Sequence, residues 1–434
     1  MSPTSARRVA LAAVLRVVEH GGYSNLVVPS GLASSGLEGA DRRFAAELSY
    51  GTLRRLVTID WMLSRIVDRP LRRTPPAALA LLRLGAYQLA FTRVPAHAAV
   101  SETVALAGRR DRGFVNAVLR RLAADPPDPP RGRRDDDIAV RTGMSTWAVR
   151  ELRRQLGDEE VEPAAAAFAE RARLTLRTNT CATSVNELDE RLASAGIATS
   201  RGRVAADSLL VDDAVVPAEL PGFADGWFAI QDQASSFVVA ALGVRPGERV
   251  LDACAAPGGK SGHLACAVAP GGTLVAGDVA PGRAALVREQ LSRLGLAGHV
   301  VAQDARAPAV RGPFDAALVD APCSGIGSAR RRPELLWRVP RDRLSTLARL
   351  QVSIAAATVG LLQPGGRLVY SVCTFPRAET DAACDALLRH RPELEPQRIE
   401  GPDGPAERVR LWPHRHGTDG MFVAAFRKAG EGGG

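Results

Sequence analysis

The feature that most constrains how this chain can fold is a glycine-rich turn between a strand pattern and a helix pattern. An apolar run that ends with Arg249–Leu251 leads into Asp-Ala-Cys-Ala-Ala-Pro-Gly-Gly-Lys at residues 252–260, and an alanine-rich helical pattern follows over Ser261–Ala269. Such a turn lets the backbone approach a ligand closely, and the helix N-terminus behind it favours negative charge. The segment therefore predicts the cofactor loop of a nucleotide-binding α/β domain.

Strand and helix patterns alternate from Phe237 onward, as expected for a parallel sheet. We expect strands at Arg249–Ala253, Thr273–Asp278, Val300–Asp304, Phe314–Asp320 and Arg367–Cys373. Helices are expected at Ser261–Ala269, Pro281–Leu294, Arg341–Leu362 and Glu379–His390. Residues 407–412 and 421–427 predict a terminal hairpin that adds an antiparallel pair at the sheet edge.

The chain before this region predicts two further domains. Residues 5–122 have helical patterns throughout, and Leu79–Phe91 is apolar on nearly all sides, which predicts the buried central helix of a bundle. A proline-rich linker follows at 125–130, and then come short strand and helix patterns. We therefore expect an all-α domain at 1–128, a small α+β domain at 136–232 and the α/β domain at 233–430.

The net charge of +9 is confined to the N-terminal quarter, because residues 1–125 hold 18 arginines and 9 acidic residues. This excess fits either a solvated helical surface or a patch that neutralises phosphates. No apolar run approaches the ~20 residues that span a bilayer. The six cysteines have no regular spacing, which predicts neither a disulfide framework nor a zinc site. We expect a monomer without metal in a reducing cytoplasm.

Three aspartates follow successive strands of the predicted sheet, at the edge where open α/β sheets bind ligands. Asp278 after the second strand suits a ribose diol, as in sites for NAD and for S-adenosylmethionine. The glycine turn lacks the G-x-G-x-x-G spacing that packs a pyrophosphate, which disfavours NAD. Asp304 suits an adenine amino group, and Asp320 could face the cofactor's methionine end or a substrate base.

Two cysteines end neighbouring predicted strands, Cys323 in Asp-Ala-Pro-Cys and Cys373 in Ser-Val-Cys-Thr. Most cysteines are inert buried hydrophobes, and we expect this of Cys181, Cys266 and Cys384. Methylation of cytosine C5 requires a thiolate that adds to C6 and so activates C5. It also requires a carboxyl group near N3, together with a second group that helps to expel the first thiol. Two thiols and Asp320 meet these requirements.

These motifs, with Arg331–Trp337, resemble those of the RNA cytosine-5 methyltransferases. His97–Glu102 and Gly113–Arg121 resemble the NusB-type RNA-binding helical domain. From about residue 5 to 428, the chain resembles the bacterial 16S ribosomal RNA cytosine-5 methyltransferases of the RsmB/Sun type. The resemblance implies an all-α NusB-like domain, a small α+β domain and a Rossmann-like methyltransferase domain. It also implies S-adenosylmethionine as cofactor and a single-stranded or loop cytosine in RNA as substrate.

The resemblance also implies roles for individual residues. Cys373 becomes the nucleophile at C6, Cys323 assists product release, and Asp320 stabilises the protonated base and borders the cofactor. The residues implied in cofactor binding are Cys254, Ala255, Ala256, Pro257, Gly258, Gly259, Lys260, Asp278, Asp304 and Asp320. The family's Thr-Cys-Ser around the nucleophile is Val-Cys-Thr here, and its downstream acidic pair and Asn appear only as Glu379-Thr380.

Three alternatives stay open at this point. One is a methyltransferase that acts on transfer RNA, since only the NusB-like region favours ribosomal RNA. Another is a non-catalytic RNA-binding factor with a vestigial methyltransferase domain. The third, an NAD-dependent oxidoreductase, is disfavoured by the loop spacing.

Overall fold

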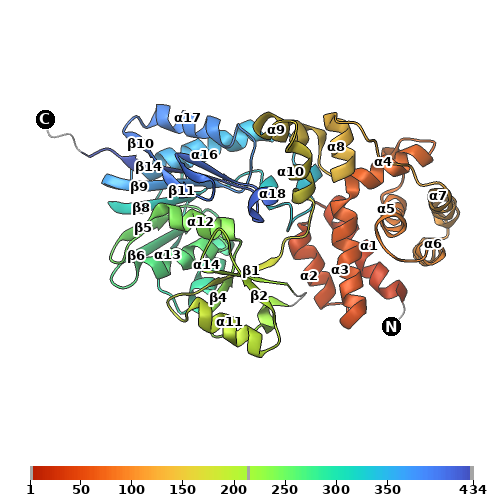
Figure 1. Ribbon diagram of the computed structural model, residues 1–434, viewed down its shortest axis with the longest axis horizontal. Helices are drawn as coiled ribbons and strands as arrows, with labels where there is room; N and C mark the ends of the chain where they lie inside the picture. Colours follow the sequence, from red (N-terminus) through yellow and green to blue (C-terminus); the bar gives the residue numbers. More distant parts are fainter. Residues whose placement is uncertain (1–2, 213–215, 431–434) are drawn as a thin grey trace. The chain divides into compact units, whose positions relative to one another are not determined.

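The computed structural model describes residues 3–212 and 216–430, which divide into two compact units (Figure 1). The first unit contains the chain up to residue 171 together with residues 329–339, and the second contains the remainder. No helix in the described ranges is long and apolar enough to cross a membrane.

The first unit is entirely helical, as predicted for residues 5–122. Its helices are α1 (Pro3–Val18), α2 (Ser24–Ala33), α3 (Gly39–Arg54), α4 (Leu56–Ile66), α5 (Pro76–Phe91), α6 (Ala96–Ala105), α7 (Arg112–Ala124), α8 (Asp135–Thr142), α9 (Thr146–Leu156), α10 (Val161–Phe168) and α15 (Leu335–Arg338), with a 3₁₀ turn at Leu71–Arg73. Helix α5 is buried over most of its length, which confirms it as the central helix of the bundle. Helices α8 to α10 also belong to this unit, although all their residues except Asp135 lie within the α+β domain that the sequence predicts at 136–232.

Residues 329–339 join the helical unit although they follow the Cys323 motif in the sequence. Glu334 is fully buried there and accepts a hydrogen bond from the Ser24 hydroxyl at 2.6 Å. Trp337 donates its indole N–H to the Leu53 carbonyl at 2.9 Å, and Arg338 donates to the Gly22 carbonyl at 2.9 Å. The Arg331–Trp337 motif is therefore an anchor in the first unit.

The second unit begins with a four-stranded antiparallel sheet in the order β2-β3-β1-β4. Its elements are β1 (Leu174–Thr178), α11 (Val185–Ser194), β2 (Thr199–Arg201), β3 (Ser208–Val211), a 3₁₀ turn at Pro217–Glu219 and β4 (Phe228–Ile230). Apolar side chains of β1, β3 and α11 form its core. This confirms the small α+β fold of the middle region.

A larger mixed sheet follows, in the order β10-β14-β9-β8-β5-β6-β7. Its elements, with those that connect them, are α12 (Gln233–Leu242), β5 (Arg249–Asp252), α13 (Gly259–Val268), β6 (Thr273–Asp278), α14 (Pro281–Arg293), β7 (His299–Ala302), β8 (Phe314–Asp320), a 3₁₀ turn at Ile326–Ser328, α16 (Arg343–Val359), β9 (Leu362–Val372), α17 (Asp381–His390), β10 (Leu394–Gln397), β11 (Ile399–Gly401), β12 (Gly404–Ala406), β13 (Arg408–Leu411), α18 (Pro413–His416) and β14 (Met421–Lys428). Strands β5 to β9 run parallel, which confirms the predicted α/β class.

The terminal hairpin forms as predicted, but it has an additional neighbour. Strands β13 and β14 pair antiparallel as expected, but β14 also pairs with both β9 and β10. The strand at Leu394–Gln397 was missed, and it covers β14 on the side away from β9. The hairpin therefore adds an antiparallel pair at the sheet edge, as predicted, and β13 shares that edge with β10.

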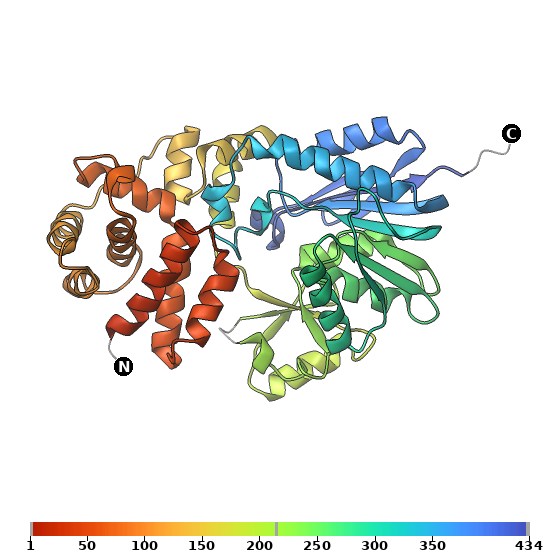
Figure 2. The ribbon, with the colours of Figure 1, turned by 180° about the vertical axis from the view of Figure 1, so that it is seen from behind.

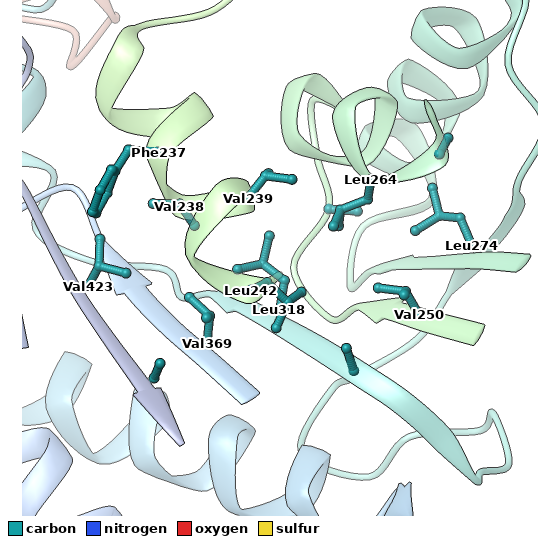
Figure 3. Close-up of a cluster of buried hydrophobic side chains, with 14 of the residues drawn as sticks. Phe237, Val238, Val239, Leu242, Val250, Leu264, Leu274, Leu318, Val369 and Val423 are labelled. Atoms are coloured by element: carbon teal, nitrogen blue, oxygen red, sulfur yellow. The ribbon is translucent and has the colours of Figure 1, made fainter. Parts of the chain in front are cut away.

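Side chains alternate along the strands of the large sheet, so apolar cores form on both of its faces. Val250 and Leu318 face α12, α13 and α14, and Figure 3 shows them packed with Leu264. Leu251 and Val319 point the other way, toward α16 and α17. Figures 1 and 2 show these two helical layers from opposite sides. Because both faces are covered, ligand access is left to the carboxyl edge of the strands.

Candidate active site

The two predicted cysteines meet at the carboxyl edge of the large sheet. Strands β8 and β9 are parallel neighbours with Asp320 opposite Ser371, so the loops that follow them leave side by side. The Sγ atoms of Cys323 and Cys373 lie 3.4 Å apart, within hydrogen-bonding distance for sulfur, and both residues are partly buried. This confirms the prediction that both thiols reach one place.

The two thiols differ in acidity. A hydrogen bond from Cys323 lowers the pKa of the Cys373 thiol, and the positive charge of Lys260 adds to this effect against burial and the charge of Asp320. The same hydrogen bond, together with burial, raises the pKa of Cys323 well above its ordinary value. Cys373 is therefore the more acidic of the two thiols, and Cys323 is the less acidic one beside it.

Lys260 links the glycine loop to this pair of thiols. Its Nζ lies 2.7 Å from Asp320 Oδ2 and 3.3 Å from the Ser235 hydroxyl, and the Ser371 hydroxyl donates to Asp320 Oδ1 at 2.8 Å. Burial opposes the charge of Lys260, but the carboxylate of Asp320 outweighs it and raises the lysine pKa. The ammonium group therefore stays charged and holds Asp320 in place.

The glycine loop has the shape expected of a cofactor cradle. Gly258 adopts φ +106°, and a Cβ there would come within 3.0 Å of the Val287 Cα, so only glycine fits. The backbone N–H of Ala255 donates to the Gly277 carbonyl at 2.8 Å, and that of Ala256 to Asp278 Oδ2 at 3.3 Å. These contacts hold the turn between the ends of β5 and β6, next to α14.

The other predicted loop residues lie in the same turn. Cys254 is partly buried and packs against the apolar core beneath the sheet, and burial raises its thiol pKa. Pro257 is exposed on the outside of the turn, and Gly259 begins α13. Cys254 is therefore a packing residue of the loop.

The acids after β6 and β7 have different surroundings. Asp278 is nearly buried and holds the loop through Ala256 and Arg283, whose Nε lies 3.2 Å from Oδ2. Asp304 is on the surface, where Arg306 binds both of its carboxylate oxygens and lowers its pKa to about 2. The structure thus joins Asp278 to the loop and places Asp304 in a local ion pair.

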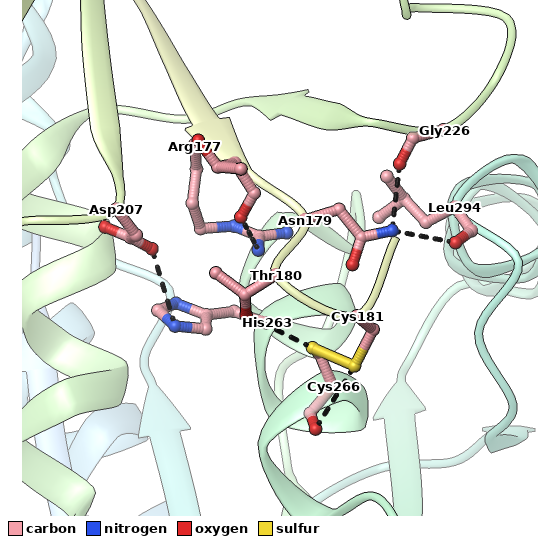
Figure 4. Close-up of a disulfide and its surroundings, with 10 residues drawn as sticks. Arg177, Asn179, Thr180, Cys181, Asp207, Gly226, His263, Cys266 and Leu294 are labelled. Carbon is pink, nitrogen blue, oxygen red and sulfur yellow. Dashed lines mark hydrogen bonds and ion pairs between the residues drawn. A yellow bond between two sulfur atoms is a disulfide. The ribbon is translucent and has the colours of Figure 1, made fainter. Parts of the chain in front are cut away.

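A disulfide links Cys181 to Cys266 on α13, with a Cα–Cα distance of 5.8 Å (Figure 4). The prediction of inert thiols is therefore wrong for this pair, whereas Cys384 is a buried thiol with its pKa raised by burial to about 12. Beside the bridge, Asn179 donates to the carbonyls of Gly226 and Leu294 at 2.8 and 2.9 Å. The bridge and Asn179 together fasten the small sheet to the helices of the large one, and nothing in the cysteine spacing indicates this.

Comparisons with known proteins agree with this geometry. Residues 4–124 match the NusB family, 144–217 match the ferredoxin-like domain of RsmF/B-like methyltransferases, and 239–427 match the family described as 16S rRNA methyltransferase RsmB/F. A probable ribosomal RNA small subunit methyltransferase B from Bacillus subtilis is 34% identical over 99% of this chain and 100% of its own.

Two further similarities extend the comparison. Ribosomal RNA small subunit methyltransferase B from Vibrio cholerae is 34% identical over 97% of both chains. The solved structure of a methyltransferase homolog from Pyrococcus horikoshii is 29% identical, with a TM-score of 0.58, over 67% of this chain and 98% of its own. The chain therefore belongs to the RsmB/F family of 16S ribosomal RNA methyltransferases.

Proposed function

We propose that this methyltransferase modifies C5 of a cytosine in 16S ribosomal RNA, with S-adenosylmethionine as the methyl donor. Cys373 acts as the nucleophile at C6, and Cys323 assists release of the methylated product. The observation that carries the proposal is the pair of thiols 3.4 Å apart beside the Lys260–Asp320 ion pair.

Cys373 starts the reaction. Its lowered pKa keeps a fraction of the thiol ionised near neutral pH, and the thiolate forms a bond to C6 of the base. The electron pair displaced from the C5–C6 double bond then makes C5 nucleophilic. C5 of free cytosine is too weak a nucleophile to accept a methyl group without this step.

Asp320 and Lys260 handle the polar edge of the base. The carboxylate of Asp320 accepts hydrogen bonds from the protonated N3 and the 4-amino group, which stabilises the positive charge that makes C6 open to addition. The ammonium of Lys260 and the hydroxyl of Ser371 fix the orientation of that carboxylate. Both contacts exist before substrate binds, so little reorganisation is needed.

Cys323 acts after C5 is methylated. Its pKa is raised partly by the negative charge of Cys373, and this charge disappears when Cys373 is bonded to C6. Cys323 then gives up its proton to solvent and, as the thiolate, removes the hydrogen from C5 as a proton. The C5–C6 double bond re-forms, the C6–S bond breaks, and Cys373 leaves as a thiolate.

The glycine loop, Asp278 and Lys260 form the site for the cofactor, which supplies an electrophilic methyl group when bound. The close approach of backbone at Gly258 and the carboxylate of Asp278 suit its amino acid and ribose portions. Asp304 could contact the adenine amino group, but its carboxylate would have to share or leave Arg306.

Substitutions of the two cysteines test the proposal on transcribed 16S ribosomal RNA. Cys373→Ala should abolish methyl transfer while calorimetry shows unchanged S-adenosylmethionine binding. Cys323→Ala should trap a covalent protein–RNA adduct that survives a denaturing gel. Cys384→Ala is the matched control and should retain activity. Full activity of Cys373→Ala would exclude it as the nucleophile.

The choice of RNA needs a separate experiment. Bisulfite sequencing of 16S ribosomal RNA and of transfer RNA from a strain that lacks the protein should reveal one lost 5-methylcytosine in the ribosomal fraction. A loss confined to transfer RNA would mean that transfer RNA, and not 16S ribosomal RNA, is the substrate. No loss in either, with no cofactor binding in vitro, would favour a non-catalytic RNA-binding factor.

A further inference from the structure

We propose that Glu379 is a positioning residue that sets the distance between the two active-site thiols. This inference rests on the proposed function, because it gives a purpose to the spacing of Cys323 and Cys373. The sequence alone assigns no role to Glu379. In the contacts described, its side chain does not touch either sulfur.

Glu379 binds the loop that carries Cys323. Its carboxylate is fully buried, and it accepts hydrogen bonds from the Ser324 backbone N–H at 2.8 Å and from the Ser324 hydroxyl at 2.5 Å. Gln351 on α16 donates to Glu379 at 2.9 Å and to the Pro322 carbonyl at 3.0 Å. The residues on both sides of Cys323 are therefore held by one buried group and its amide partner.

The same carboxylate reaches the second cysteine loop through a hydroxyl relay. The Oγ atoms of Ser324 and Thr374 lie 2.6 Å apart, and Thr374 directly follows Cys373. Ser324 has one hydroxyl hydrogen, which it gives to Glu379, so Thr374 must be the donor in the hydroxyl pair. The order Thr374 to Ser324 to Glu379 thus ties each cysteine's neighbour to one carboxylate.

Two more contacts make the arrangement rigid. The Tyr370 hydroxyl lies 2.7 Å from the Glu379 carbonyl and donates to it, and Tyr370 lies on β9 just before Cys373. On the other side, the Gly327 N–H donates to the Cys373 carbonyl at 2.9 Å. A Cβ on Gly327 would come within 2.7 Å of that carbonyl oxygen, so the loops are in close contact.

The hydrogen-bond pattern decides which substitutions should be tolerated. In Glu379→Gln the remaining oxygen still accepts from Ser324 N–H and Gln351, and the new amide donates to the Ser324 hydroxyl, which then donates to Thr374. The hydrogen-bond network is therefore kept, with the donor and acceptor roles of the Ser324 and Thr374 hydroxyls exchanged. Glu379→Leu has a similar volume but accepts nothing, so buried donors lose their partner. If Glu379 positions the thiols, their spacing should be kept in Glu379→Gln and lost in Glu379→Leu.

Disulfide trapping measures the thiol spacing without RNA or cofactor. Diamide takes one hydrogen from each thiol of the reduced pair, so that a Cys323–Cys373 disulfide forms and the N=N bond of diamide is reduced to a hydrazine. Mass spectrometry of non-reduced peptides reports the rate for this pair alone. Glu379→Leu should slow cross-linking by at least about tenfold, which corresponds to ~1.4 kcal/mol, while Glu379→Gln should stay within about twofold.

Glu248→Leu is the matched control. Glu248 is a largely buried acid that pairs with Arg367 at 2.5 Å, at the amino end of the strands and away from the thiols. The Glu248→Leu variant should be less stable than the wild type but should form the Cys323–Cys373 disulfide at the same rate. All rates are compared at a temperature where each variant is folded by circular dichroism. A folded Glu379→Leu protein that cross-links at the wild-type rate would overturn the inference.

The methyltransferase reaction gives an independent readout. In Glu379→Leu, kcat should fall about as much as the cross-linking rate while KM for RNA stays within about twofold, because RNA contacts are unchanged. A change in KM alone would contradict positioning. Failure of the proposed function is distinguishable: active Cys373→Ala would remove the nucleophile assignment, yet the cross-linking result would still report whether Glu379 sets the thiol spacing.

Discussion

The ammonium of Lys260 lies 2.7 Å from the carboxylate of Asp320, which joins the first turn of α13 to the last residue of β8. The chain has only one other lysine, Lys428. The ion pair is largely buried, and both side chains belong to the proposed site for cofactor and base. Removing one partner of such a pair leaves a charge without compensation.

Lys260→Met should therefore lower kcat by about 100-fold, as expected when an oriented electrostatic group is lost. S-adenosylmethionine binding, measured by calorimetry, should weaken less than kcat falls. Lys428→Met is the control, because Lys428 donates to the Leu362 carbonyl at 2.7 Å at the other end of the sheet. It should lose some stability and keep its activity, and equal activity losses in both variants would contradict a specific role of Lys260.

The acidity of Cys373 should depend on Cys323. Cys323 donates the hydrogen bond that lowers the pKa of Cys373, so Cys323→Ala should shift the pH midpoint of Cys373 alkylation upward. Iodoacetamide labelling across pH, followed by peptide mass spectrometry, measures the midpoint. In the wild type it should lie below the ordinary thiol value of 9.0. Cys384 provides an internal control, because burial raises its pKa to about 12 and it should react last.

The pairing of the two thiols could be predicted because it follows from topology. Two consecutive strand patterns in a parallel sheet end at the same edge, and each is followed by a cysteine at nearly the same distance. The Asp278 carboxylate and the glycine loop meet for the same reason. These predictions required only the order of the elements, and the register between Asp320 and Ser371 completes them.

The contacts that depend on long-range packing could not be predicted. The disulfide joins residues 85 positions apart through a loop of the small sheet, and no local pattern reports that approach. Glu379 is predicted as the first residue of a helix, but α17 begins at Asp381, and no helical pattern indicates the contact of Glu379 with the Cys323 loop. Residues 329–339 follow the Cys323 motif in the sequence, and only the packing shows that Glu334 holds them in the helical unit.

The stability of the protein should fall as pH rises from 4 to 7 because of Asp252. Burial raises the pKa of Asp252 from 3.8 to about 7. As pH rises through this range, the Asp252 carboxyl ionises in the unfolded state while it stays neutral in the folded state, and this ionisation stabilises the unfolded state. The free energy of unfolding should decrease by up to about 1.4 kcal/mol per pH unit in this window and become level above it. Urea unfolding of wild type and Asp252→Asn measures the effect.

Asp252→Asn should remove this dependence, since Asn does not ionise and still accepts the hydrogen bond that Ser261 donates to Asp252 at 2.7 Å. Asp304→Asn is the comparison. The pKa of Asp304 is lowered to about 2 by Arg306, so its contribution is already present above pH 4. This substitution should leave the slope between pH 4 and 7 unchanged. A slope that persists in Asp252→Asn would assign it to other groups.

The disulfide should stabilise the second unit without taking part in the reaction. Replacing both Cys181 and Cys266 by Ser should lower the free energy of unfolding by about 2–4 kcal/mol, because the bridge closes a long loop in the unfolded chain. Methyl transfer should change less than twofold. Mass spectrometry of the non-reduced protein checks the bridge, and wild type with dithiothreitol should unfold like the double variant.

The arginine-rich first unit should contact RNA phosphates. Arg109 and Arg110 are exposed in the loop between α6 and α7, within the part of the chain that carries the whole charge excess. Replacing both by Gln should weaken binding of a 16S ribosomal RNA fragment and reduce the slope of log K against log salt by about 1.4, because single-stranded RNA loses ~0.7 per phosphate contact. Filter binding between 50 and 300 mM salt, roughly the range over which counterion release is resolved, gives the slope.

The double substitution of Arg150 and Arg154 by Gln removes the same charge from α9, where the arginines pair with Asp135 and Glu151. It should leave the slope nearly unchanged, because those arginines already have acidic partners and contact fewer phosphates. Equal reductions in both double variants would mean that only net charge matters. A reduction confined to Arg109 and Arg110 would locate phosphate contacts in the loop before α7.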